Sequence, residues 1–206
     1  MPDNGPSGPF RCPDTLVEEM TSGIPPGGSD GHDVHAELET QRLAIRPWRK
    51  DDRAALEQMV RDTEMMRYVT QGRIWSDQAV DELLERQRRH LDRHVVCFAA
   101  TTLKSSGEVI GLVGLQQLDS GDFELGWWIW KDYWGQGYAT EAARAFVDHA
   151  REVMNLTTLV AVIDPPNAAS KAVAEKLGMR FECIKSAHET SARRPEVPIE
   201  LYRIRL

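Results

Sequence analysis

The sequence predicts an α/β protein built on a mixed, mostly antiparallel sheet with helices on both faces. Three strands are expected at 95–103, 108–118 and 122–130, and only short turns separate them, which is typical of an antiparallel meander. A helix over 138–154 then joins the third strand to an apolar strand at 157–164. Because a helical crossover connects parallel strands, the strands on either side of this helix should form the parallel pair.

The elements before the meander follow from local patterns. Residues 42–48 alternate between apolar and polar types, as a strand does. Residues 50–62 have aspartates near their start and apolar residues at helical spacing, which predicts a helix. Residues 76–94 carry a long apolar stripe, and Ser76 stands where the N-cap of that helix is expected.

The elements after the meander are also predicted by periodicity. Alanines and large apolar residues share one face of 138–154 and charged residues the other, so this helix should pack on the sheet. A shorter helix is predicted over 167–178, with Asn167 as N-cap and Gly178 as C-terminal stop. The chain then ends in two predicted strands, "FECIK" and "IELYRIRL".

Residues 1–36 differ in composition from the rest of the chain. They are dense in Pro, Gly, Ser and Asp and contain few branched apolar residues. Such a segment cannot bury enough apolar surface to offset the entropy of ordering it, so we predict a flexible tail. Residues 37–206 are enough for one domain with its own core.

The charge and the hydropathy pattern disfavour two kinds of partner. A net charge of −7 over 206 residues argues against nucleic-acid binding. The N-terminus is acidic and has no apolar core segment, and no apolar run approaches the roughly 20 residues of a membrane span. The expectation is a cytoplasmic protein without membrane contact.

The cysteine and histidine spacings predict no metal site. Cys12, Cys97 and Cys183 are far apart and form no CxxC pair, so we expect thiols in a reducing compartment rather than a disulfide framework or zinc ligands. Three histidines show no partner pattern and are expected on the surface: His90, His94 and His149.

Two glycines stand where the helix over 138–154 is about to begin, in "KDYWGQGYATEAA". Helix N-termini expose unpaired N–H groups, and glycine lets an anion approach them, so Gly135 and Gly137 fit a phosphate cradle. A tight turn without a ligand fits the spacing equally well. The P-loop pattern is absent, and Thr140 stands where the dinucleotide-binding pattern requires Gly or Ala, so a dinucleotide-binding oxidoreductase remains only an alternative.

The loop resembles the acyl-CoA loop of the GNAT N-acetyltransferase superfamily, with the pattern Arg/Gln-x-x-Gly-x-Gly/Ala matched from Trp134 to Ala139. Further segments resemble the RimJ/RimL branch in the same order: "ETQRLAIRPWRKDD", "GEVIGLVGLQ", "FELGWWI", "YWGQGYATEAARAFVDHA" and "NAASKAVAEKLGM". Together they cover roughly residues 38 to 185. One departure is Trp134, where many members have Arg or Gln, because an indole cannot pair with phosphate as a guanidinium can.

The resemblance implies acetyl-CoA as donor, held between two parallel strands that splay apart. The pantetheine arm would pair with the backbone at Ile129 and Trp130, and Asn167 would contact it as well as cap its helix. The diphosphate would lie on the main-chain N–H groups of the glycine loop: Gly135, Gln136, Gly137, Tyr138, Ala139 and Thr140.

The same resemblance suggests the residues that handle protons. Glu124 is a carboxylate among aromatic residues, and a carboxylate at this point of the family commonly activates the amine. The alternatives are an exposed strand residue paired with a cation, or Asp122 in its place. Family members often supply the proton for the leaving thiolate from a tyrosine, but the matching residue is Ala174. Ser170, one turn earlier, is the candidate acid, although a first-turn serine that bonds backbone fits equally well.

The sequence therefore predicts a metal-free N-acetyltransferase that moves the acetyl group of acetyl-CoA to a primary amine by direct attack. The acceptor would be a small molecule or a peptide N-terminus, and the enzyme a monomer or homodimer. Acceptor specificity would come from Arg73, Trp75 and Trp128. The alternative within the same fold is a non-catalytic acyl-CoA sensor.

Overall fold

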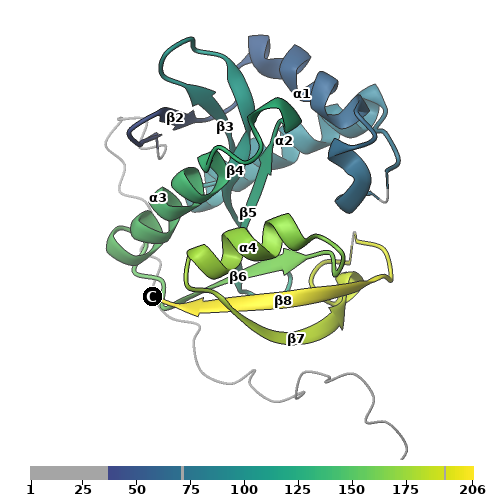
Figure 1. Cartoon of the computed structure of the whole chain (residues 1–206), viewed down its shortest axis with the longest axis vertical. Coiled ribbons are helices and arrows are strands. Elements are labelled where there is room, and N and C mark those ends of the chain that lie inside the picture. The colour runs from purple at the N-terminus through teal and green to yellow at the C-terminus, as the bar shows by residue number, and fades with distance from the viewer. Residues whose placement is uncertain (1–36, 71, 193) are drawn as a thin grey trace, which may run out of the picture.

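The computed structural model describes residues 37–70, 72–192 and 194–206, so the expected tail at 1–36 lies outside the described residues. The strands form one eight-stranded sheet in the order β1-β2-β3-β4-β5-β6-β8-β7. Figure 1 shows the helices arranged around this sheet.

The N-terminal part contributes two short strands and two helices. β1 (Leu38–Glu39) and β2 (Leu43–Arg46) form the antiparallel edge of the sheet. The predicted helix at 50–62 begins as a 3₁₀ turn and continues as α1 (Arg53–Arg61). α2 (Asp77–His94) begins as predicted, because the Ser76 side chain accepts a hydrogen bond from the Ala79 N–H.

The predicted meander is confirmed. β3 (Phe98–Leu103), β4 (Val109–Gln117) and β5 (Phe123–Ile129) are paired antiparallel in sequence order. β3 starts later than the predicted strand because Val95 ends α2 in the left-handed conformation, with φ of 62°. A β-branched residue is strained there and cannot extend the strand.

The C-terminal part contains the crossover. α3 (Tyr138–Glu152) leads from β5 to β6 (Thr158–Ile163), and these two strands run parallel, as predicted. α4 (Ala168–Lys176) follows, and then β7 (Arg180–Ser186) and β8 (Pro198–Arg205) form an antiparallel pair. β8 lies between β6 and β7, so the last strand of the chain occupies an interior position of the sheet.

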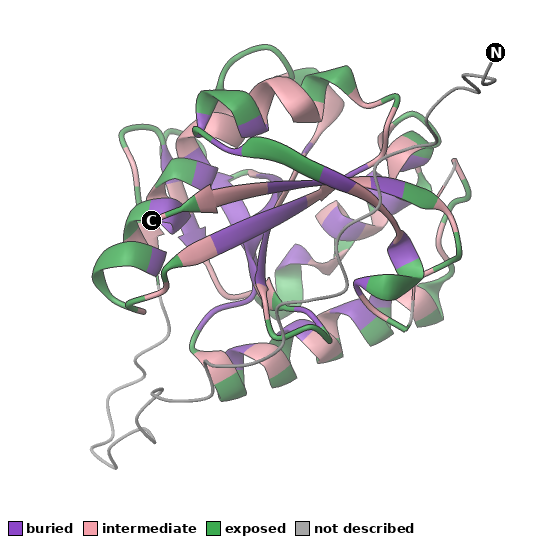
Figure 2. Ribbon diagram, turned by 90° about the horizontal axis from the view of Figure 1, so that it is seen from below, coloured by how far each residue is buried: buried purple, intermediate pink, exposed green. Residues whose placement is uncertain are grey.

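The core has a layer on each face of the sheet. α3 and α4 contribute Phe146 and Ala174 to the layer that contains Leu125, whereas α1 and α2 contribute Leu56 and Leu83 to the opposite layer. Figure 1 shows α3 in front of the strands and α2 behind them, and Figure 2 shows buried residues along the central strands. Helices on both faces were predicted and are confirmed.

The cysteines are only partly as expected. Cys97 is a free, buried thiol, and burial raises its pKa to about 12. Cys183 is disulfide-bonded, so the prediction of free thiols was wrong for this residue. The spacing of three distant cysteines gave no indication of this bond. Among the described residues, no helix has the length and apolarity needed to cross a membrane.

His90 ties the end of α2 to β4 and is not the surface residue that was predicted. Its Nδ1 is 2.7 Å from the Val96 carbonyl oxygen, and the Gln117 N–H donates to its Nε2 at 2.7 Å. The ring must therefore be neutral, with its proton on Nδ1. Burial is the main cause that lowers the pKa of His90 to about 4, and the neighbouring His94 and Arg93 lower it further.

This neutral histidine should make stability depend on pH. His90 binds a proton near pH 6.5 when unfolded but only near pH 4 when folded, so the unfolded state holds more protons between these values. The stabilisation is complete above pH 6.5 and is lost as pH falls towards 4. It should amount to about 2 kcal/mol, after allowance for solvent screening of a partly buried ring. Urea unfolding at pH 7.5 and pH 4.5 measures it.

His90→Gln should show a smaller difference between the two pH values than the wild type. His188→Gln, which changes an exposed histidine, serves as the control and should keep the full difference. A His90→Gln variant that loses stability in parallel with the wild type would show that other groups cause the acid sensitivity.

Candidate active site

A cleft opens where the two parallel strands separate. β5 and β6 share the single Cα pairing Glu124–Val160, and beyond it they diverge towards Ile129 and Ile163. Residues of both strands line a cleft of about 1250 Å³. The cleft extends to the start of α3 on one side and to α2 on the other. Residues of β5 and β6 form its floor.

The glycine loop closes one end of the cleft. Gly135 and Gly137 have φ of 74° and 82°, a conformation that costs any residue with a Cβ roughly 1–2 kcal/mol. Within the described chain, no hydrogen bond is made by the main-chain N–H groups from Gly135 to Thr140, and the first helical bond is donated by Glu141 to Gly137. These amides carry the partial positive charge of the helix start and are available to an anion.

Trp134 lies at the mouth of the cleft and is 48% exposed. Its indole N–H donates to the Ile129 carbonyl oxygen at 2.5 Å, at the last residue of β5. The indole is thus bonded to the strand and not aimed at the loop amides. A pantetheine arm that pairs with the Ile129 carbonyl has to compete with this bond.

Glu124 lies on the floor of the cleft and is only 5% exposed. Its Oε2 accepts two hydrogen bonds, one from Gln116 Nε2 at 2.6 Å and one from Arg194 Nη2 at 2.6 Å. No described residue donates to Oε1. One oxygen of the carboxylate is therefore fixed by the protein, while the other is left for a partner in the cleft.

The two partners of Glu124 were not predicted as site residues. Gln116 is paired with Glu124 across the β4–β5 hairpin. Its place beside Glu124 could therefore have been inferred from the register of the predicted meander. Arg194 comes from the segment between β7 and β8, and it also donates to Thr190 Oγ1 at 3.0 Å. Nothing in the spacing of the sequence places it near Glu124. Asp122, the alternative base, is paired instead with Arg203 at 2.9 Å.

Asn167 and Ser170 lie at the start of α4 and line the cleft opposite β5. The Asn167 side chain accepts a hydrogen bond from the Ser170 N–H at 3.0 Å, which confirms the predicted cap. The Ser170 hydroxyl makes no hydrogen bond within the described part of the chain. It is therefore not occupied by the backbone, unlike many first-turn serines.

Aromatic and basic side chains form the half of the cleft near α2. Trp75 and Trp128 meet edge to face with ring centroids 5.9 Å apart, and Arg73 lines the same half. Among the described residues, Trp130 and Gln136 are the predicted site residues that do not line this cleft. Trp130 lies in a second pocket of about 500 Å³ beside α1.

The sequence matches the family described as "Acetyltransferase (GNAT) domain" over residues 42–180. The chain belongs to the GNAT acetyltransferases of the RimJ/RimL type and is an acetyl-CoA-dependent N-acetyltransferase. The fold is thus an acetyl-CoA-binding one, and neither the dinucleotide-binding oxidoreductase nor the non-catalytic sensor is retained.

Two curated relatives illustrate the range of this family. The uncharacterized N-acetyltransferase YnaD of Bacillus subtilis is 28% identical over 158 residues, which is 74% of this chain and 90% of YnaD. The spermidine N(1)-acetyltransferase of Escherichia coli K12 is 26% identical over 146 residues, 68% of this chain and 74% of that enzyme.

Solved structures show the same fold. An acetyltransferase from Agrobacterium tumefaciens superposes with a TM-score of 0.70 at 28% identity, over 86% of this chain and 99% of that chain. Mycobacterium smegmatis RimJ, solved with a CoA-disulfide, superposes with a TM-score of 0.65 at 21% identity, over 79% and 81%.

The ion pair between Glu124 and Arg194 should be strongly coupled, because its side chains are only 6% and 25% exposed. Arg194→Ala alone leaves a buried carboxylate without its cation and should be more destabilising than Arg194→Ala made in a Glu124→Gln background. A double-mutant cycle in urea unfolding should give a coupling of about 1–3 kcal/mol. The exposed Arg88–Glu85 pair is the control and should show no measurable coupling. Additive effects at Glu124 and Arg194 would contradict a tight pair.

Proposed function

We propose that this enzyme transfers the acetyl group of acetyl-CoA to a primary amine by direct attack, with Glu124 as general base. The observation that carries the proposal is the position of Glu124 at the one point where β5 and β6 still pair. A thioester held between the diverging strands would lie next to this carboxylate. Glu124 lines the cleft and its Oε1 has no donor among the described residues, so this oxygen can accept a proton from an amine that enters from the α2 side.

The amine must be neutral to attack, and this requirement gives the base its role. At pH 7 deprotonation costs about 1 kcal/mol for an α-amine with a pKa near 7.8, and about 4.6 kcal/mol for a lysine-like amine near 10.4. Gln116 and Arg194 hold Oε2, which restricts rotation of the carboxylate. A fixed base of this kind contributes a factor of roughly 10²–10⁴.

The coenzyme would be held mainly by main-chain groups. The amides from Gly135 to Thr140 would bind the diphosphate, and the end of β5 at Ile129 would face the pantetheine arm. Trp130, also expected there, does not line the cleft, and its main-chain N–H already donates to the Ile110 carbonyl oxygen at 2.7 Å. Asn167 lies across the cleft from β5, but its oxygen already accepts from Ser170. The amide Nδ2 of Asn167 therefore remains as the group for a coenzyme carbonyl.

The leaving thiolate would receive its proton from Ser170, whose hydroxyl has no other partner among the described residues. A covalent route through cysteine does not fit the described thiols. Cys97 is not among the residues of the cleft, and burial raises its pKa to about 12, so it stays protonated. Direct attack on the thioester is the route that the residues of the cleft support.

The charges of the cleft favour a peptide N-terminus or a small monoamine over a polyamine. The chain has a net charge of −7, but this charge is not concentrated in the cleft. Two acidic residues of the α2 half, Glu64 and Glu82, stand against four arginines: Arg73, Arg86, Arg89 and Arg93. Arg89 is paired with Glu85, and the other three arginines still outnumber the two carboxylates. A polyamine with several cationic nitrogens would be repelled there, whereas an acceptor with one amine and carbonyl or anionic groups would not.

A thiol-release assay with acetyl-CoA tests this acceptor class. A tetrapeptide with a free α-amine and a blocked C-terminus is compared with spermidine at equal ionic strength and pH 7.5. We expect a kcat/KM for the peptide at least tenfold above that for spermidine, a difference of about 1.4 kcal/mol in transition-state binding. A higher value for spermidine would reverse the assignment of acceptor class without touching the role of Glu124.

Glu124→Gln should lower kcat by about 10²–10⁴ while the affinity for CoA stays the same. Glutamine keeps the size and the bond to Gln116 or Arg194 but cannot take a proton. The residual rate should rise with pH until the acceptor amine is itself neutral. Asp122→Asn is the matched control, because Asp122 lies two residues before Glu124 on the chain but pairs with Arg203. Full activity of Glu124→Gln, or loss of activity in Asp122→Asn alone, would move the base to another residue.

A further inference from the structure

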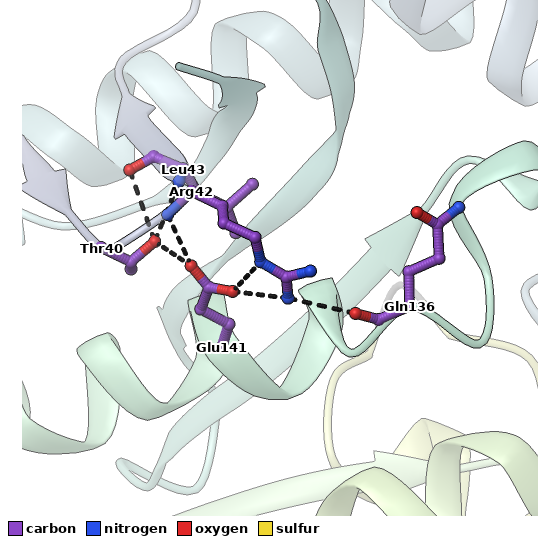
Figure 3. A network of polar contacts seen from close by, with 5 residues as sticks. All are labelled: Thr40, Arg42, Leu43, Gln136 and Glu141. Carbon is purple, nitrogen blue, oxygen red and sulfur yellow. Dashed lines mark hydrogen bonds and ion pairs between the residues drawn. The ribbon is translucent and has the colours of Figure 1, made fainter. Parts of the chain in front are cut away.

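The turn between β1 and β2 touches the glycine loop (Figure 3), and none of its residues lines the cleft. We propose that Arg42, in this turn, orients the peptide between Gln136 and Gly137 so that its N–H faces the coenzyme diphosphate. Arg42 is then a positioning residue for the coenzyme, and the inference rests on the proposed binding of the diphosphate by the loop.

Arg42 is fixed to the first turn of α3 by a carboxylate. Its Nε donates to Glu141 Oε2 at 2.7 Å, its Nη2 lies 2.6 Å from the same oxygen, and its main-chain N–H donates to Oε1 at 2.9 Å. Thr40 Oγ1 donates to Oε1 at 2.5 Å. Figure 3 shows Glu141 between the turn and the helix. Both the backbone and the side chain of Arg42 are therefore held at one position.

From this position the guanidinium reaches the loop. Arg42 Nη2 donates to the Gln136 carbonyl oxygen at 3.1 Å, and the guanidinium carbon lies 4.2 Å from the centre of the Tyr138 ring. A Cβ on Gly137 would lie 3.6 Å from Nη2. The guanidinium of Arg42 thus packs directly against Gln136 and Gly137, the two residues that precede α3.

The geometry of the peptide bond links the contact between Arg42 and the Gln136 carbonyl to the direction of the Gly137 N–H. In a planar trans peptide the C=O and the following N–H point in opposite directions. Because the Gln136 carbonyl points to Arg42, the Gly137 N–H points away from it. Gly137 lines the cleft, whereas Arg42 is not among its lining residues. The bond to Arg42 therefore holds the Gly137 N–H in a direction away from Arg42, at a residue that lines the cleft.

Arg42 acts through the loop and not as a phosphate ligand. Its charge is matched by Glu141. Burial alone would raise the pKa of Glu141, but the hydrogen bonds from Thr40 and Arg42 outweigh burial and hold the pKa below its ordinary value. The pair is thus neutral overall at pH 7. Trp134 supplies no cation to the loop either, so the affinity for phosphate depends on how well the amides are prearranged.

Binding of CoA and of pantetheine, which lacks the phosphates, separates this role from a general structural one. Arg42→Ala should weaken the calorimetric Kd for CoA by between about 10-fold and 100-fold, because one amide is no longer directed at the diphosphate. The Kd for pantetheine, from ligand-observed NMR, should change less than twofold. Arg144→Ala is the matched control, since Arg144, on α3, likewise donates to a main-chain carbonyl, that of Lys176, away from the loop. It should bind both probes as the wild type does.

Arg42→Lys covers the case in which Arg42→Ala does not fold. A lysine can pair with Glu141, but its single ammonium cannot also hold the Gln136 carbonyl in the same geometry. It should therefore show an intermediate loss for CoA and none for pantetheine. Equal losses for the two probes, or no loss for CoA, would overturn the role of Arg42. If the wild type binds CoA no more tightly than pantetheine, the diphosphate does not bind the loop, and the proposed coenzyme site fails together with this inference.

Discussion

The active site depends on one break in an otherwise continuous sheet. β4 and β5 are paired along their whole length, but β5 and β6 meet only at Glu124 and Val160. Past that point the facing edges of both strands have backbone groups with no strand opposite them, and such groups require a partner. A flexible arm that carries amides can supply these bonds and extend the sheet across the break. The break also leaves Glu124 on the floor of the cleft, so one distortion opens the space between the strands and places a carboxylate in it.

A buried carboxylate at this break requires compensation, and the surrounding segments provide it. Gln116 comes from the neighbouring strand, while Arg194 comes from the segment that precedes β8. That segment is itself tied to the β4–β5 turn, since the Ala192 N–H donates to Asp119 Oδ2 at 2.8 Å. The guanidinium of Arg194 is therefore held beside Glu124 by a segment that is bonded to the β4–β5 turn. Because both described donors bind Oε2, Oε1 remains as an acceptor.

Local patterns of sequence predicted most of the fold but only part of the site. Ser76 and Asn167 were recognisable as caps because capping is settled within three residues of the chain. The start of β3 was placed too early because Val95 adopts a left-handed conformation that its side chain disfavours. The bonds of Glu124 to Arg194 and of Arg42 to Glu141 join residues 70 and 99 positions apart. Periodicity carries no information at that range, and the resemblance suggested Glu124 as the base without indicating its partners.

One half of the cleft is formed largely by main-chain groups and the other by side chains. This difference explains how one family can serve many acceptors. The proposed coenzyme half consists largely of main-chain amides and two left-handed glycines, so most side-chain substitutions leave it intact. Trp134 is therefore compatible with the proposed anion site. The acceptor half consists of side chains from α2 and the loop before it, such as Trp75 and Arg86. Each of these can change without disturbing the sheet, so relatives that keep the fold are free to differ in the amine they accept.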